Sequence, residues 1–230
     1  SQHDALPILG AIIPGTARVE GRLTGRASGK LLPGQRLVAS GQTSLAKSSI
    51  HWQGPKGDVR VDLRQASLDW VWQDEALSGD ITLVLKEYGK LEGRLRLPVA
   101  ARLPISMDAK STMEASLQGQ VREKGALSTL FPGLIQESRG DLDVDLKLSG
   151  NRAEPLIEGN LRFSKAGGYL PTAGITLKDA RLDVYFEKDA IRLESFRAAS
   201  GPGHIEGSAL IRMKKNQVTS FEGRLDGERF

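Results

Sequence analysis

The side chains that could carry metal or acid–base chemistry are scattered along this sequence. The three histidines, His3, His51 and His204, lie far apart and lack the spacing of metal ligands. His204 and Glu206 would share one face of a strand as a candidate metal pair, but we favour a solvent-exposed turn there. We therefore predict no metal site from the histidines.

Asp141, Asp143 and Asp145 form an acidic ladder on one face of an expected strand, where they could bind a cation. Metal-binding loops bring their ligands to one point through a tight turn, whereas a strand spreads such residues about 7 Å apart. We therefore interpret the ladder as a solvated face.

The chain has no pattern typical of a catalytic or nucleotide-binding centre. It contains no cysteine, which excludes disulfides, thiol catalysis and cysteine-based zinc sites. Segment 29–35 lacks the Walker pattern, and no helix is expected after the glycine-rich segment 166–171 to offer a phosphate-binding terminus. No nucleophile has a partnered base. We expect no enzyme, no catalytic residue, no metal and no cofactor.

Charge and hydropathy exclude further classes of protein. The 32 basic and 28 acidic residues give a net charge of +4 and are spread along the chain, which argues against a nucleic-acid partner. No apolar run approaches the roughly 18 residues of a membrane span, so we expect none in this segment. Segment 5–15 is apolar but short and lacks the basic start of a signal peptide. We expect a piece of a longer chain that carries its targeting segment elsewhere.

Most of these residues are expected to lie on β-strands or the turns between them, because alternation of apolar and polar residues with a period of two dominates the sequence. In segment 140–150, GDLDVDLKLSG, apolar residues alternate with aspartate and lysine, so one face is apolar and the other polar. Segments 81–97 and 182–196 are typical of two hairpins. Turn signals about every 8–12 residues favour a meandering antiparallel sheet.

A short element of the form apolar, polar, glycine, polar, apolar recurs along the chain, for example as LEGRL and IEGNL. In a strand its glycine lies on the apolar face. Glycine there marks either curvature of the sheet or the close approach of another molecule, and these interpretations are compatible. The glycines concerned are Gly21, Gly93, Gly159, Gly207 and Gly223.

A longer repeat relates segments 6–23 and 127–144, each an apolar patch with a Pro-Gly pair followed by a strand. These two patches lack strand alternation, and we predict short helices near 5–13 and 126–136. We divide the chain into a first β-trough repeat, 1–124, and a second, 125–230, continuous with it.

The predicted sheet has no evident second layer to cover its apolar face. Two short helices are too few to cover the apolar face of so many strands. Glycines on that face and the small number of aromatic residues argue against a filled core. We therefore predict an all-β fold: an elongated antiparallel sheet curled into an open, taco-like trough with an apolar interior. An acyl chain is the natural occupant, since burial of each CH₂ contributes about 0.8 kcal/mol. The predicted lining residues are Ile81, Leu83, Leu85, Leu91, Leu95, Leu97, Leu142, Val144, Leu146, Leu148, Ile157, Leu161, Phe163, Leu182, Val184, Phe186, Ile191, Leu193, Ile205 and Ile211.

The second half of the sequence resembles the TamB family, the inner-membrane subunit of the translocation and assembly module. The resemblance is clear over 126–230 and looser over 1–125, and it suggests a fragment of the C-terminal region. The motifs that carry it are Leu-Phe-Pro at 130–132, Gly-Asp-Leu at 140–142, SG followed by PLIEG within 149–159, Leu-Pro at 170–171, GITLKDARL at 174–182, SGPGHIEGSA at 200–209 and LDGERF at 225–230.

This resemblance implies a periplasmic protein of Gram-negative bacteria, anchored to the inner membrane by an N-terminal segment absent here. It implies a bridge-like, AsmA-like protein that carries phospholipids between the membranes. It also implies a TamA-like outer-membrane barrel of the Omp85 type as partner, with outer-membrane proteins as further candidate clients. The family offers no catalytic residues.

Three functions stay open at this point. A lipid-conducting trough would use the apolar face, whereas a protein-binding scaffold would pair a client strand with an open sheet edge. A structural stalk would have a filled interior instead.

Overall fold

The computed structural model describes residues 18–54, 57–85, 89–102, 111–124, 128, 135–151, 154–214 and 217–229. Within them the chain forms twelve β-strands and a short 3-10 turn, Pro33–Gln35. The strands are β1 (Arg18–Leu32), β2 (Arg36–Gly54), β3 (Gly57–Gln73), β4 (Ala76–Leu85), β5 (Gly89–Leu97), β6 (Glu114–Lys124), β7 (Gln136–Gly150), β8 (Pro155–Leu170), β9 (Ile175–Glu187), β10 (Ala190–Ser200), β11 (Gly203–Lys214) and β12 (Gln217–Glu228).

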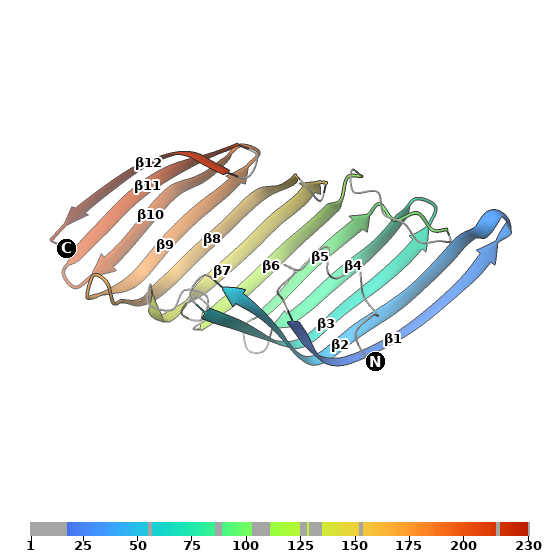
Figure 1. The fold of residues 1–230 in the computed structure, drawn as a ribbon. Helices are drawn as coiled ribbons and strands as arrows, with labels where there is room; N and C mark the ends of the chain where they lie inside the picture. The colour runs from blue at the N-terminus through green and yellow to red at the C-terminus, as the bar shows by residue number, and fades with distance from the viewer. Residues whose placement is uncertain are drawn as a thin grey trace.

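The strands form one antiparallel sheet in which each strand pairs with its neighbours in the sequence (Figure 1). The sheet is open, because β1 and β12 are its two edges and do not pair with each other. This arrangement confirms the predicted all-β fold and is consistent with an elongated open trough. The sheet also continues directly from β6 to β7, which lie on either side of the predicted boundary, and the division into two repeats stays a prediction.

The predicted hairpins are confirmed, with short turns between strands of alternating sequence. Segment 81–97 forms most of β4 and β5, and segment 182–196 falls in β9 and β10. Asp74 and Glu75 connect β3 to β4 in a two-residue turn, where Asp74 has a φ of 51°. Lys188 and Asp189 connect β9 to β10 in the same way. Such local signals explain why the sequence order and the sheet order agree.

The predicted helices fall largely outside the described residues. The segment near 5–13 lies wholly outside them. Of the segment near 126–136, Ser128 has helical geometry, Ile135 has no regular structure and Gln136 begins β7. The prediction of helix as far as 136 is therefore wrong, because strand pairing with β8 already begins at Gln136.

Irregularities at neighbouring positions bend the first three strands. The β1–β2 pairing shifts between Glu20 and Arg22, and the β3–β4 pairing shifts between Leu63 and Gln65. Between them on β2, Lys47 has a φ of 49°. Because a bulge bends its strand, the segments beyond these positions turn away from the plane of the other strands (Figure 1).

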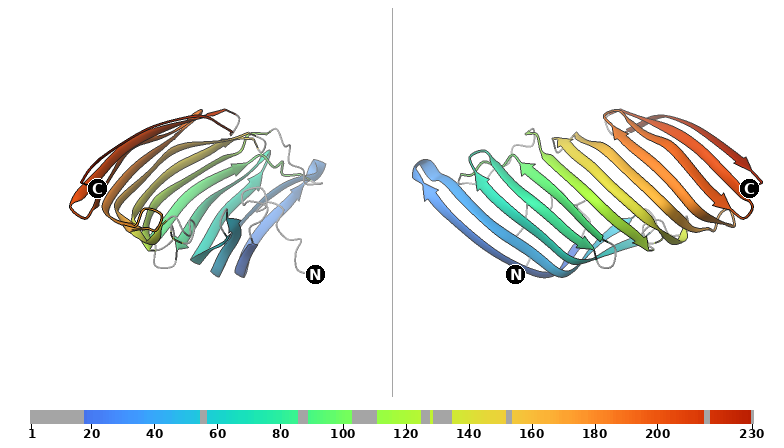
Figure 2. Two further views of the ribbon diagram at one scale, coloured as in Figure 1. Left: turned by 60° about the vertical axis from the view of Figure 1, so that its left-hand side comes forward. Right: turned by 180° about the vertical axis from the view of Figure 1, so that it is seen from behind.

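A second group of irregularities lies in the later strands. Lys165 in β8 and Asp179 in β9 both have a φ of 49°, and the β8–β9 register shifts between Phe163 and Ala166. The strands arch along their length when the sheet is seen from the side (Figure 2). Bulges and curvature thus shape a single layer that no helix of the described residues covers.

Among the described residues, no helix has the length and apolar character required to cross a membrane.

Candidate functional site

The apolar positions of successive strands lie directly opposite one another. Because paired residues in an antiparallel sheet point to the same side, a row of pairs defines one face. We call the face that carries the following row the apolar face. From β4 to β12 this row consists of Leu83, Leu91, Gly119, Val144, Leu161, Val184, Leu193, Ala209 and Gly223.

The register places every predicted lining residue on the apolar face. Three parallel rows accompany the first: one through Ile81, Leu146 and Ile211, one through Leu95 and Ile157, and one through Leu142 and Phe163. Their role as the lining of a lipid groove stays a prediction. Two of the predicted residues lie on this face outside the four rows: Leu97 pairs with Leu77, and Ile205 pairs with Ala198. The predicted residues that the four rows hold together are Ile81, Leu83, Leu85, Leu91, Leu95, Leu142, Val144, Leu146, Leu148, Ile157, Leu161, Phe163, Leu182, Val184, Phe186, Ile191, Leu193 and Ile211.

The same face extends beyond the residues selected from the sequence. Leu23 in β1 is 49% exposed, and Phe221 and Leu225 in β12 are 68% and 66% exposed, all on the apolar face. Leu117 and Val121 complete it in β6. The alternation that identified the other strands is present in these segments too, so it could have found them.

Glycines on the apolar face lie against the backbone of the next strand. A Cβ atom at Gly93 would stand 2.2 Å from the carbonyl oxygen of Ser116, and one at Gly159 would stand 2.1 Å from that of Asp145. A side chain has no room at either position. Of the two interpretations of these glycines, curvature of the sheet is therefore supported, because the close neighbour is the sheet itself.

The chain fills one corner of the apolar face with its own side chains. Leu77, Leu95 and Leu97 form a buried cluster with Val99 and Met113, from the connection between β5 and β6. Leu97 is only 3% exposed. The expectation that the trough is unfilled is thus wrong at this corner, since the connection between β5 and β6 supplies the cover.

Hydrogen bonds hold the covering segment in place. Trp72 Nε1 donates to the carbonyl oxygen of Val99 over 2.8 Å. The backbone N–H of Leu37 donates to the carbonyl of Ala101, and the N–H of Ala101 to that of Asp74, each over 2.7 Å. The segment after β5 is therefore tied to β2, β3 and the β3–β4 turn.

A second buried cluster lies toward the other ends of the strands. Ala166, Leu177, Ala180 and Ala198 from β8, β9 and β10 form it. Ala166 and Ala180 pair directly because the bulge residues Lys165 and Asp179 intervene. Small side chains suit the crowded bend of the sheet.

Ser138 in β7 is buried and exchanges hydrogen bonds with Ser128. The Oγ atoms of Ser128 and Ser138 are 2.8 Å apart, and each also accepts a hydrogen bond from the other residue's backbone N–H over 2.9 Å.

The opposite face is charged, as the alternation predicted. Asp141 lies 3.9 Å from Arg122 and 3.3 Å from Lys165, so cationic side chains are the neighbours of this carboxylate. A hydrogen bond from Arg162 to Asp183, with the attraction between the two charges, raises the pKa of the Arg162 guanidinium. These exposed pairs keep the face hydrated.

The described histidines, His51 and His204, do not belong to a group of metal-ligating side chains. His51 Nε2 lies 2.7 Å from Ser49 Oγ and 3.7 Å from Glu20, while Glu206 pairs with Arg197 over 2.9 Å. No group of three His, Asp or Glu side chains within the described ranges could hold a metal ion.

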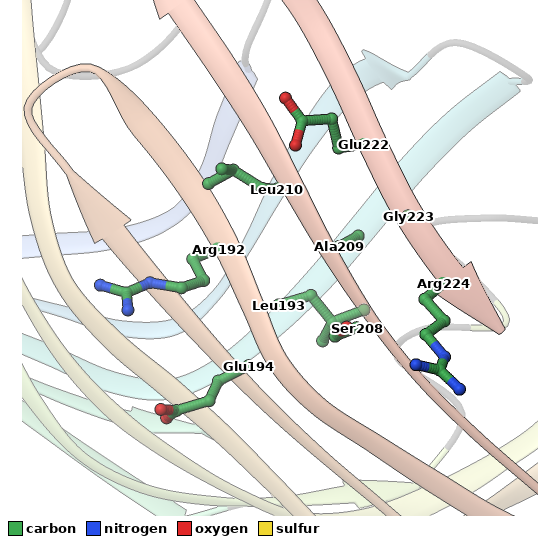
Figure 3. A pocket seen from close by; sticks show the side chains of 9 residues that line it. All are labelled: Arg192, Leu193, Glu194, Ser208, Ala209, Leu210, Glu222, Gly223 and Arg224. Carbon is green, nitrogen blue, oxygen red and sulfur yellow. The ribbon is translucent and has the colours of Figure 1, made fainter. Parts of the chain in front are cut away.

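The charged face is also shallowly hollowed at its C-terminal end. Figure 3 shows side chains of β10, β11 and β12 around a hollow of about 520 Å³. Arg192, Glu194, Glu222 and Arg224 line it beside Leu210. Opposite charges alternate there, so the hollow has no net preference for an anion or a cation.

Comparison with known proteins identifies the family. A search of curated proteins and a search of solved structures each found no match. The family model described as TamB, N-terminal domain, matches residues 1–163. The match thus covers all of 1–125, where the sequence resemblance is looser, and the part 126–163 of the stretch where it is clear. Its description names the N-terminal domain where we expected the C-terminal region. Since the matched residues make up more than half of the sequence, the chain belongs to the TamB family.

Proposed function

We propose that the apolar face shields phospholipid acyl chains during their passage between the inner and outer membranes. The observation that carries this proposal is continuity: the four rows of paired residues that cross the middle of this face consist only of apolar residues and glycine. Burial of each CH₂ group against such a surface contributes about 0.8 kcal/mol. Every contact is weak and non-directional, so a chain can slide.

The family agrees with a role of this kind. TamB proteins belong to a transport and assembly module that bridges the membranes of Gram-negative bacteria, and they are not known as enzymes. We propose a periplasmic location for this segment, an inner-membrane anchor elsewhere in the protein, and an Omp85-type, TamA-like barrel as the outer-membrane partner. Outer-membrane proteins are candidate clients of the same system.

Two adjacent positions on β7 provide the test. Leu146 lies on the apolar face between Leu117 and Gly159, and Asp145 is exposed on the charged face. A photo-crosslinking amino acid at position 146 should capture phospholipid in cells, whereas the same group at 145 should not. Equal labelling at the two positions would refute the proposal.

A second candidate function is a scaffold that templates outer-membrane barrels or secreted proteins by strand pairing. The edge strand β12 favours it, since Val218, Phe221 and Leu225 are strongly exposed there. Strand pairing is available only at an edge, because β2 to β11 each have two partners. Proline substitutions at β12 residues whose N–H does not bond β11 should abolish this function and leave lipid capture at position 146 unchanged.

A further inference from the structure

The two buried clusters occupy opposite corners of the apolar face. Leu97 is the last residue of β5. The pairing register places the end of β7 and the start of β8 on the same side of the sheet as Leu97. Ala166 and Ala198 lie near the ends of β8 and β10, on the other side. One corner is therefore closed over β3 to β6, and the diagonally opposite corner over β8 to β11.

Between these corners most apolar residues stay partly accessible, and Val144 on β7 is a buried exception at 9% exposure. On β4 and β5 the half-buried leucines are Leu83, Leu85 and Leu91, away from the closed end. On β8 the most exposed apolar residue of the face is Ile157, at 48%. The β8 residue in the same row as Leu91 is Leu161, which is four positions from Ile157. Four residues of a strand span about 13 Å. The accessible strip thus moves along the strand direction as it crosses the sheet.

We propose that acyl chains follow this oblique strip, and that the two closed corners are permanent walls of the groove. This inference rests on the proposed function and defines which lining residues meet lipid. The strip passes Leu83 and Leu91, continues through Leu146 and Leu161, and reaches the side of Ile157, Phe186 and Ile191. Leu95 and Leu97, although on the same face, belong to a wall.

The chemistry of the strip fits a hydrocarbon chain. Its side chains offer no hydrogen-bonding group, and the backbone groups beneath it pair within the sheet. An occupant with polar groups would have to bury them unpaired, at a cost of about 1–3 kcal/mol for each group. The wall over β3 to β6 is also fixed in place, because Trp72 and the backbone of Leu37 hold the covering segment by hydrogen bonds.

Leucine itself provides the test. Photo-leucine, a diazirine analogue of similar size, replaces leucine throughout the protein in growing cells, and lipid adducts are mapped by mass spectrometry after irradiation. Leu83, Leu91 and Leu161 should carry phospholipid adducts. Leu77 and Leu97 should instead crosslink within the chain, with lipid labelling no higher than at a background position.

Leu210 supplies that background, because it lies beside Ala209 but on the charged face. Lipid adducts on Leu97 and Leu177 equal to those on Leu91 would overturn the oblique path and leave the proposed function standing. Lipid labelling on the apolar face no higher than at Leu210 would overturn the proposed function as well. Adducts restricted to the strip support both.

Discussion

Replacement of Leu146 by arginine puts a permanent charge in the middle of the apolar face. Leu146 is half-buried on β7 and pairs with Leu117 on one side and Gly159 on the other. Because Gly159 carries no side chain, the arginine stem has room to lie across it. The guanidinium then occupies the surface that an acyl chain must cross.

The effect on folding should be small and the effect on transport large. Full burial of a leucine stabilises by about 1.5–3 kcal/mol, so loss of this half-buried side chain costs about 1 kcal/mol. For a chain of this size we expect Tm to fall by about 2–4 °C. Displacement of water from a guanidinium by an acyl chain costs several kcal/mol, and a cost of about 3 kcal/mol slows passage roughly 100-fold.

The assay measures the rate at which the protein moves a labelled phospholipid from donor to acceptor vesicles, with Tm from thermal unfolding measured in parallel. Asp145→Arg is the matched control, since it adds the same side chain on the charged face of the same strand. We expect the control to transfer lipid normally. A folded Leu146→Arg variant that transfers lipid at the normal rate, or an equal defect in the control, would refute the reasoning.

Three further predictions concern the stability of the sheet. Gly93→Ala should destabilise by about 1–3 kcal/mol in urea unfolding, because its Cβ would meet a backbone oxygen at 2.2 Å, whereas Gly25→Ala, with its nearest atom at 3.3 Å, should destabilise less. Trp72→Phe should lower stability by about 1–3 kcal/mol by leaving the carbonyl of Val99 unpaired, and an unchanged Tm would contradict this. Ser138→Ala removes the buried hydroxyl beside Ser128 and should destabilise by about 1–3 kcal/mol, also measured by Tm, with Ser138→Thr as the variant that keeps the hydroxyl.

The sequence by itself determined the strands and their two faces. A period of two is a local property, so Leu142 and Asp143 point to opposite sides wherever the strand lies. Short turns between consecutive strands then fix the meander, and the hairpins at 81–97 and 182–196 followed directly. For this reason the selected lining residues share one face. The helix expected as far as 136 failed because the apolar patch hid the start of β7.

Only the tertiary structure decided which parts of the apolar face stay open. Leu91 and Leu97 have the same place in the alternation of β5, yet Leu97 is buried by Val99 and Met113. That cover comes from a connection whose path depends on hydrogen bonds to distant strands. Bulges such as Lys165 likewise shift the register by one residue, which local periodicity does not reveal. Alternation assigns a residue to a face, whereas its access to a lipid depends on how the connections between strands pack over that face.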